Sequence, residues 1–272
     1  MTIEDIRLTV HDEFLAFSKE YDRYTLGDGA NIDTALLNQV EDYLCRHQGK
    51  RLRPLLVLLS AKACGHLSFG HIMLATAMEM LHNATLMHDD VVDESDNRRG
   101  SESIKKIWGN QVAVLCGDYY LAQAMSILQK TESREASILI TETVATMSRG
   151  ELAQLYWTAG KSITQDIYLN IIGSKTASLM STCCELGALS LNANQPSPYR
   201  KALHDFGYHY GLVFQMLDDL ADEQTVHDIQ LPSTSSPQTL IDQHKELAST
   251  ALKQLPDSPS RNALENMLHL LV

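Results

Sequence analysis

Apolar residues recur at intervals of three and four along most of this chain, which is the periodicity of amphipathic helices. Prolines are few, and the alternating β-branched pattern that is typical of strands is scarce. The spacing predicts helices over 55–65, 70–92, 110–129, 133–158, 165–192, 198–223, 239–254 and 260–271. Turn-forming clusters lie between them, and the clearest break is "LPSTSSPQ" at 231–238. We therefore predict one all-α domain over residues 1–272.

Composition and charge narrow the class of protein. The 272 residues suffice for a substantial core, and the net charge of −12 argues against a general nucleic-acid binder. The five cysteines form no C-x-x-C pair, which is typical of a reducing compartment and not of a disulfide framework or zinc site. Apolar runs such as "PLLVLLSA" at 54–61 are too short for a transmembrane segment, and the N-terminus does not resemble a signal peptide. We therefore expect a soluble, cytoplasmic protein.

An acidic stretch, "HDDVVDESDNRRG", ends the apolar segment 70–92. If that segment is a helix, Asp89 and Asp93 are about one turn apart on one face, with Asp90 beside them. Like charges at this spacing destabilise a bare helix by a few tenths of a kcal/mol. A hard divalent cation would offset this repulsion, and carboxylates without His or Cys favour Mg²⁺ or Mn²⁺. The alternative is an ordinary solvated helix end. An EF-hand is excluded because its central glycine and final glutamate are missing.

A second stretch, "FQMLDDLADE" at 214–223, repeats the pattern with Asp218, Asp219 and Asp222. It too ends an apolar helical segment, "GYHYGLVFQML". Two D-D-x-x-D groups in this position suggest two helices that face each other across a cavity, with metal ions between them that hold a diphosphate. To explain both stretches as exposed helix ends requires the same coincidence twice.

Basic residues cluster near the same points of the sequence. They are Lys50, Arg51 and Arg53 in "GKRLRP", Arg98 and Arg99 after the first acidic group, and Lys175 in "IIGSKTASL". Arginine matches phosphate oxygens with its planar fork, and lysine does so with its compact charge. Each residue taken alone could equally be a solvated surface cation.

Two further polar residues lie in apolar helical segments. His82 precedes Asp89 by seven residues, or two turns, and Gln215 precedes Asp218 by three. Each is either a hydrogen-bonded core residue or a contact to an anionic ligand, and the residue pattern leaves both interpretations open.

In this combination, the sequence resembles the all-trans polyprenyl diphosphate synthases, most of all their long-chain, octaprenyl-type members. The shared segments run in order over roughly 45–225: "GKRLRP", "LHNATLMHDDVVDESDNRRG", "VLCGDYYLAQA", "ELAQL", "GSKTASLM" and "GLVFQMLDDLAD". The resemblance implies the isoprenoid synthase fold, a bundle of ten or more helices around a central cavity. It also implies a Mg²⁺ cofactor, with Mn²⁺ as a substitute, and a homodimer.

The resemblance further implies a reaction, in which isopentenyl diphosphate condenses with farnesyl or geranylgeranyl diphosphate to give a longer all-trans polyprenyl diphosphate. Metal would be bound by Asp89, Asp93 and Asp218, and supported through waters or hydrogen bonds by Asp90, Asp219 and Asp222. Arg98 and Lys175 would bind the allylic diphosphate, whereas Lys50, Arg53, His82 and Arg99 would bind isopentenyl diphosphate. Thr176 and Gln215 would line the carbocation, and the released diphosphate would serve as the base.

Residues one turn before the first aspartate group bear on product length in that family. Here they are Ala84 and Thr85, both small, and this implies a product longer than farnesyl diphosphate. Leu81 and Met78, one and two turns further back, are the next candidates to stop the growing chain. The alternative is that the small residues serve only helix packing.

One segment departs from the family pattern. A loop with G-K-x-x-G-x-D and G-K-x-T-L-P motifs normally follows the second aspartate group, but this chain has the shorter, lysine-free "EQTVHDIQLPSTSSPQ". A lysine expected to contact the allylic diphosphate is therefore missing. Either activity is weakened or another residue, such as Arg149 or Lys161, replaces it.

Three rival interpretations follow from these residues. A weakly active or non-catalytic subunit of a heteromeric synthase fits the altered loop, although such subunits usually lose an aspartate group. A class I terpene cyclase would carry an N-x-x-x-S-x-x-x-E second motif instead of D-D-x-x-D. A di-iron helical bundle would need E-x-x-H pairs, which the chain lacks.

Overall fold

The computed structural model describes residues 2–25, 35–98, 100–158, 163–191, 197–221, 229–230 and 236–271. Contacts between Cα atoms divide the chain into two compact units. Unit 1 comprises Met1–Val10, Leu56–Ser68 and Arg134–Val272, and unit 2 comprises His11–Leu55 and Phe69–Ser133. The expectation that residues 1–272 act as one domain stays a prediction.

The all-α class is confirmed for the described residues. Their only strands are two residues long: β1 (Asn97–Arg98) pairs antiparallel with β2 (Ser101–Glu102), and β3 (Ile163–Thr164) pairs parallel with β4 (Ile229–Gln230). No helix within the described ranges combines the length and apolarity needed to cross a bilayer.

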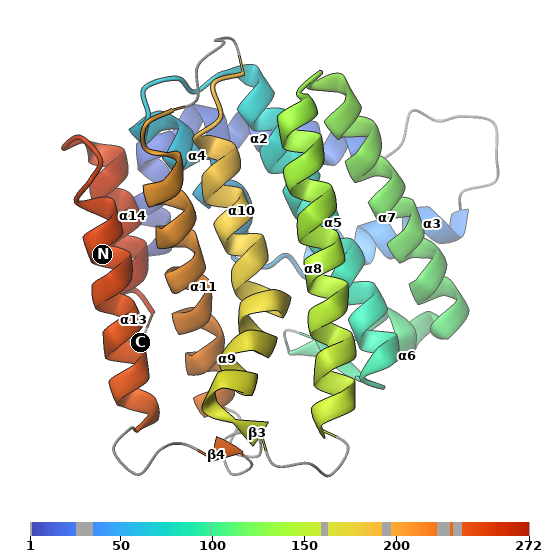
Figure 1. Cartoon of the computed structure of the whole chain (residues 1–272). Coiled ribbons are helices and arrows are strands. Elements are labelled where there is room, and N and C mark those ends of the chain that lie inside the picture. The colour runs from blue at the N-terminus through green and yellow to red at the C-terminus, as the bar shows by residue number, and fades with distance from the viewer. Residues whose placement is uncertain are drawn as a thin grey trace. The chain divides into compact units, whose positions relative to one another are not determined.

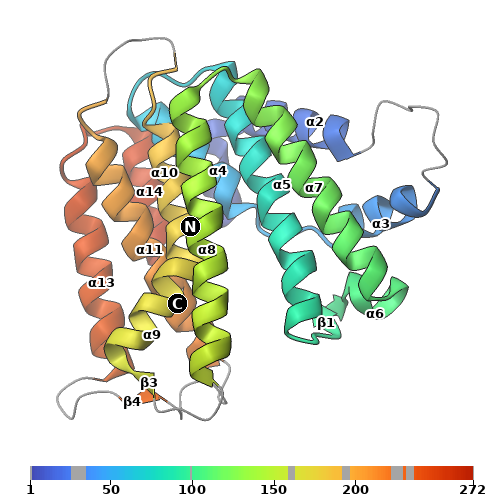
Figure 2. The same cartoon turned by 45° about the vertical axis from the view of Figure 1, so that its right-hand side comes forward.

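Unit 2 is built around one long buried helix. Its helices are α2 (His11–Thr25), α3 (Ala35–Arg46), α5 (Phe69–Val92), α6 (Ile104–Trp108) and α7 (Asn110–Lys130). α5 is buried on all sides from His71 to Leu81, as expected of a core helix whose sequence is apolar all round. It packs along α7 and also contacts α2 and α6 (Figure 2). The first acidic group therefore stands at the end of a rigid element.

Unit 1 holds the remaining helices. They are α1 (Ile3–Arg7), the short η1 (Leu8–Val10), α8 (Arg134–Thr158), α9 (Gln165–Ile172), η2 (Gly173–Ala177), α10 (Ser178–Gly187), α11 (Arg200–Ala221), α13 (Pro237–Leu252) and α14 (Pro259–His269). α9, η2 and α10 form one continuous rod that lies between α8 and α11 (Figures 1 and 2). The unit boundary falls within α4 (Leu52–Ala63).

The helix ends differ from the sequence expectation in three informative places. α4 begins three residues early, because Pro54 lies in its first turn, where a missing N–H costs no hydrogen bond. The expected helix 165–192 contains the π-helical turn η2 and ends at Gly187. α11 is described to Ala221, so the last two residues of the expected helix 198–223 lie outside the described part.

Two histidines join α11 to α13. The Nδ1 atoms of His209 and His244 are 2.9 Å apart, and their rings are stacked with centroids 5.1 Å apart. Burial lowers the pKa of His209, although Asp205 opposes this shift. Burial and the neighbouring His209 lower the pKa of His244 to about 4. One neutral ring can donate to the other, but two charged rings would repel each other across this contact.

We predict that this pair makes the protein less stable in acid. An unfolded histidine takes up its proton below about pH 6.5, whereas folded His244 does so only near pH 4, so stability falls as the pH drops between these values. Urea unfolding at pH 7 and pH 4.5 should show wild type losing about 1 kcal/mol more than His244→Phe, because His244 is partly exposed and solvent screening reduces the effect of its pKa shift. Equal losses in the two proteins would contradict this role of the pair.

Candidate functional site

The first aspartate group lies at the end of α5 in unit 2. The Asp93 N–H donates to the Asp89 carbonyl at 2.8 Å, so helical hydrogen bonding continues one residue beyond the helix. Asp89 is half-buried, Asp90 is buried and Asp93 is exposed. The three carboxyl groups therefore have distinct environments despite their proximity in sequence.

Asp90 is held by the hairpin that follows α5. The Arg98 guanidinium donates from both Nε and Nη2 to Asp90 Oδ1, at 2.8 and 2.5 Å. Burial raises the pKa of the Asp90 carboxyl, and the hydrogen bond from Arg98 opposes that rise. About a third of the Arg98 side chain (35%) remains exposed. Arg98 thus anchors Asp90 and keeps part of its guanidinium open to solvent.

Another acid of the same stretch serves local structure. Asp96 accepts from Lys106 at 2.8 Å and lies 3.7 Å from Lys105, and both lysines belong to α6. This contact lowers the pKa of Asp96. The sequence signal of five crowded carboxylates therefore overstated the number available for a ligand.

The basic residues expected to bind isopentenyl diphosphate also belong to unit 2. Lys50 is exposed in the loop before α4, Arg53 is half-buried in the first turn of α4, and His82 is buried on α5. Arg99 lies outside the described residues.

In unit 1, the expected binding residues lie on the π-helical turn η2. The Ser178 N–H bonds to the Gly173 carbonyl five residues back, the spacing of a π turn, and such turns are frequent at functional sites. Lys175 reaches α8, where its Nζ contacts Glu151 at 2.8 Å and donates to Gln154 Oε1 at 3.3 Å. The lysine is therefore held inside the helical layer by two polar partners.

Thr176, the next residue of η2, begins a chain of hydrogen bonds that continues through two residues of α11. The Thr176 hydroxyl donates to Gln215 Oε1 at 2.7 Å, and Gln215 Nε2 donates to Asp219 Oδ1 at 2.9 Å. Tyr168 of α9 donates to the other Asp219 oxygen at 2.6 Å. Burial raises the pKa of Asp219, and the bonds from Tyr168 and Gln215 oppose that rise. Both oxygens of Asp219 are thus engaged by protein donors, whereas Asp218 beside it is exposed.

Two glycines allow η2 to pack closely between its neighbouring helices. A Cβ at Gly150 of α8 would lie 2.9 Å from the backbone nitrogen of Lys175, and a Cβ at Gly211 of α11 would lie 2.5 Å from the Cα of Ala177. Both distances are too short for a side chain. The close approach lets Lys175 and Thr176 reach α8 and α11 respectively.

Tyr168→Phe is expected to lower turnover about tenfold, because a hydrogen bond to a charged group contributes about 1.5–3 kcal/mol. The ring stays, so packing of α9 should change little. Rates of the reaction that the sequence resemblance implies, together with thermal unfolding midpoints of wild type and variant, test this. Tyr208→Phe, a change on α11 outside the Asp219 chain, is the matched control and should retain the wild-type rate.

The donor chemistry of both aspartate groups suits a hard cation. The side chains are carboxylates without His or Cys, the ligands that Mg²⁺ prefers. Among the described residues, no three His, Cys, Asp or Glu side chains are grouped to hold an ion. The two groups belong to different units, and Asp222 lies outside the described residues.

The residues expected to govern product length lie on α5. Ala84, Leu81 and Met78 are buried, whereas Thr85 is half-buried and its hydroxyl donates to the His82 carbonyl at 2.8 Å. Of the four, Thr85 alone has an accessible side chain.

Sequence reasoning missed the partners of the motif residues. Glu151 and Gln154 are three apart in "ELAQL", one helical turn, and this spacing could have marked them as joint partners of a half-buried lysine such as Lys175. Tyr168 is separated from Asp219 by 51 residues and has no local signal. Arg149, a suggested substitute for the missing loop lysine, is exposed and donates to Thr146. Lys161, the other suggestion, and most of the altered loop (223–228 and 231–235) lie outside the described residues.

Comparison with known proteins identifies the family. The polyprenyl synthetase family profile matches residues 34–229, and the chain belongs to this family. Octaprenyl diphosphate synthase of Escherichia coli (strain K12) is 35% identical over 192 residues, 71% of this chain and 59% of that protein. Heptaprenyl diphosphate synthase component 2 of Bacillus subtilis (strain 168) is 32% identical over 221 residues, 81% of this chain and 63% of that protein. The chain thus spans about six tenths of the length of these relatives.

A solved structure confirms the expected isoprenoid synthase fold. A decaprenyl diphosphate synthase from Rhodobacter capsulatus is similar with a TM-score of 0.85 and 25% sequence identity. The match covers 99% of this chain and 98% of that one. The family resemblance inferred from the sequence motifs is therefore confirmed in both sequence and fold.

Proposed function

We propose that this protein is a trans-prenyltransferase. It condenses isopentenyl diphosphate with an allylic diphosphate, farnesyl or geranylgeranyl, and forms a longer all-trans polyprenyl diphosphate. Family membership supports the reaction class, and the side-chain arrangement in each unit supports the residue roles.

One observation carries the proposal. In both aspartate groups the second aspartate is tied to protein donors, Asp90 to Arg98 and Asp219 to Tyr168 and Gln215. Asp93 and Asp218 remain exposed. A metal site built from carboxylates needs both kinds of residue, because carboxylates held by hydrogen bonds orient the neighbouring carboxylates that coordinate the ion.

The proposed roles follow from this division. Asp89, Asp93 and Asp218 would hold Mg²⁺, with Asp90, Asp219 and Asp222 in support. When bound, Mg²⁺ would supply positive charge to the departing diphosphate.

The steps of the reaction suggest roles for the other proposed site residues. The C–O bond of the allylic diphosphate breaks with its electron pair on the diphosphate, the isopentenyl double bond forms the new C–C bond, and one proton leaves to the diphosphate. Lys175 and Arg98 would stabilise the leaving charge, since fixed cations act most strongly where charge develops. Thr176 Oγ1 and Gln215 Oε1 would present oxygen dipoles to the carbocation.

The isopentenyl half would be bound by Lys50, Arg53, His82 and Arg99, as the family resemblance implies. The three described residues, Lys50, Arg53 and His82, belong to unit 2, and Lys50 is exposed whereas His82 is buried. This arrangement is compatible with binding of the diphosphate group of isopentenyl diphosphate at the protein surface. We also propose a homodimer, which light scattering of the purified protein tests by mass. The cytoplasmic location that the sequence features indicate stays a prediction.

The direct test is incorporation of radiolabelled isopentenyl diphosphate with geranyl, farnesyl and geranylgeranyl diphosphate as separate primers. We expect Mg²⁺-dependent products longer than farnesyl diphosphate, resolved by chain length. No incorporation by the pure protein with any primer would contradict the proposal.

A second candidate is a weakly active or non-catalytic subunit of a heteromeric synthase. The specific observations in its favour are the lysine-free loop and the similarity to a relative named as component 2 of a heptaprenyl diphosphate synthase. Activity that appears only when cell extract is added back would favour this candidate.

A further inference from the structure

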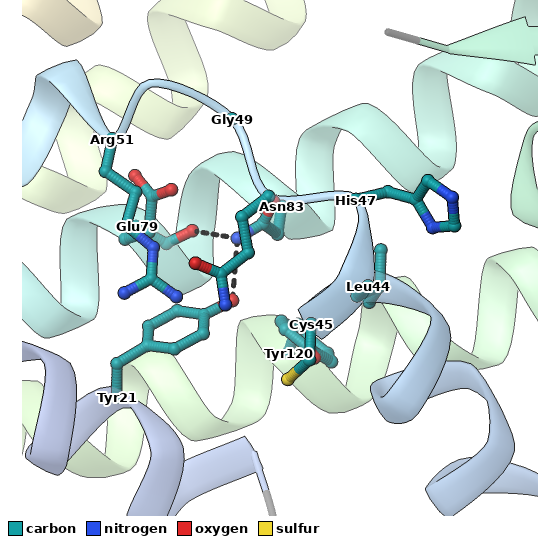
Figure 3. A pocket seen from close by; sticks show the side chains of 10 residues that line it. Tyr21, Leu44, Cys45, His47, Gly49, Arg51, Glu79, Asn83 and Tyr120 are labelled. Carbon is teal, nitrogen blue, oxygen red and sulfur yellow. Dashed lines mark hydrogen bonds between the residues drawn. The ribbon is translucent and has the colours of Figure 1, made fainter. Parts of the chain in front are cut away.

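A buried polar cluster in unit 2 has no role in the reaction described so far. Tyr21, Arg51, Glu79, Asn83 and Tyr120 surround a cavity of about 20 Å³ (Figure 3). That space holds about one water molecule, whereas a small-molecule pocket needs roughly 300 Å³ or more. The cavity is therefore too small to bind a substrate, and the polar side chains around it interact mainly with one another.

Arg51 is the unusual member of this cluster. Its φ is +48°, a left-handed backbone that side-chain-bearing residues rarely adopt, and it is 9% exposed. Such a conformation persists only where the surroundings determine it, and it is often found at functional sites. The Arg51 carbonyl also accepts from the Leu55 N–H at 3.4 Å, so this residue lies directly before α4 and caps its first turn.

The Arg51 side chain is held by stacking on aromatic rings. Its Cζ lies 4.7 Å from the centroid of the Tyr21 ring and 5.4 Å from that of Phe17. Both rings are buried on α2, and a cation–π contact is strongest where the cation is removed from water. The stacked guanidinium thus fixes the backbone turn to α2.

Tyr21, on which Arg51 stacks, is also hydrogen-bonded to α5. The Tyr21 hydroxyl accepts from Asn83 Nδ2 at 2.8 Å, and Asn83 Nδ2 also donates to the Glu79 carbonyl at 3.0 Å. Asn83 follows His82 on that helix. The loop before α4 and the α5 segment around His82 are therefore connected through Tyr21.

We propose that Arg51 is a positioning residue for the isopentenyl diphosphate half of the site. It stands between Lys50 and Arg53, and its left-handed turn, locked by the stack on Tyr21, sets where these two cations lie. This inference rests on the proposed function, which assigns Lys50 and Arg53 to isopentenyl diphosphate. Arg51 itself, buried under two rings, touches no substrate.

The test separates binding of the two substrates. Calorimetry on the full-length protein measures the affinity for isopentenyl diphosphate alone and for a non-ionising farnesyl thiodiphosphate with Mg²⁺. Arg51→Gly removes the side chain and tolerates the positive φ without strain, so the turn can still form but is no longer held by the stack on Tyr21. We expect about tenfold weaker isopentenyl diphosphate binding, because Lys50 and Arg53 are no longer held in place before the ligand binds, and an unchanged thiodiphosphate affinity.

Conservative variants distinguish positioning from general stability. Arg51→Lys keeps a cation over the ring and should restore part of the affinity, and Tyr21→Phe keeps the ring and should bind nearly as wild type. Lys130→Met is the control: Lys130 of α7 lies 4.7 Å from the centroid of the Tyr24 ring on α2 and donates to the Tyr24 hydroxyl at 2.8 Å. Because Lys130 is exposed, this variant should lower the unfolding temperature less than Arg51→Gly does, and it should leave both affinities unchanged.

Two outcomes would overturn the inference: an Arg51→Gly protein that binds isopentenyl diphosphate as wild type does, or one that loses both ligands equally. A wild-type protein that binds no isopentenyl diphosphate would overturn it together with the proposed function. A wild-type protein that binds isopentenyl diphosphate but forms no product would contradict the proposed function alone, and the Arg51→Gly affinity would still decide the inference.

Discussion

Asp218→Ala and Asp89→Ala should each lower kcat at least about a hundredfold, because each removes a carboxylate proposed to hold the charge-stabilising metal. Asp218 is exposed, and such surface substitutions usually change stability by no more than about 0.5 kcal/mol. Steady-state condensation kinetics, together with thermal unfolding of the same samples, measure both effects. The loss of activity should therefore occur in a folded protein.

Acidic residues nearby supply matched controls. Asp205 lies on α11 like Asp218 but pairs with Lys201 at 2.6 Å, and Asp96 follows Asp89 but pairs with Lys106 at 2.8 Å. Asp205→Ala and Asp96→Ala should keep near-normal rates. Near-normal rates in Asp89→Ala or Asp218→Ala would contradict the proposed metal ligands.

Thr85→Phe is expected to shorten the product to geranylgeranyl diphosphate or less. Thr85 is half-buried one turn before Asp89, so a ring there would project beside the growing chain. The same ring at Ala84, which is 2% exposed, would overpack the core and cost about 1–3 kcal/mol. Thr85 is thus the better position, and chromatography of the labelled products measures the result.

Leu86→Phe is the control for the face of the helix. Leu86 follows Thr85 by one residue, so its side chain is rotated about 100° around α5. It should leave the product length unchanged. If both variants shorten the product, or neither does, the assignment of this face of α5 to product length is wrong.

Much of the fold could be predicted from the sequence because helix periodicity is a local property. The segment 70–92 differs from α5 by one residue, and 110–129 differs from α7 by one. The π turn η2 could not be predicted, since the close packing that accompanies it depends on Gly150 and Gly211 of two other helices. A tertiary cause of this kind leaves no periodic signal.

The candidate site shows the same division between local and long-range information. The aspartate groups and Lys175 were recognised because their spacing or their apolar context is visible in the chain. Their supporting partners were not, because Tyr168 reaches Asp219 only through folding, and Arg51 is indistinguishable in sequence from its neighbouring cations. Residues with the same charge in the sequence differ in burial in the structure: Asp90 is buried and Asp93 is exposed, and Arg51 is buried and Lys50 is exposed.

As a trans-prenyltransferase, the protein would release one diphosphate for each isopentenyl unit that it adds to the allylic diphosphate. The most direct measurement compares diphosphate released with labelled isopentenyl diphosphate incorporated by the pure protein with farnesyl diphosphate and Mg²⁺. We expect equal amounts of the two, and no release of diphosphate when isopentenyl diphosphate is omitted. Release from farnesyl diphosphate alone would indicate a cyclase or hydrolase and would contradict the account, as would the absence of both release and incorporation.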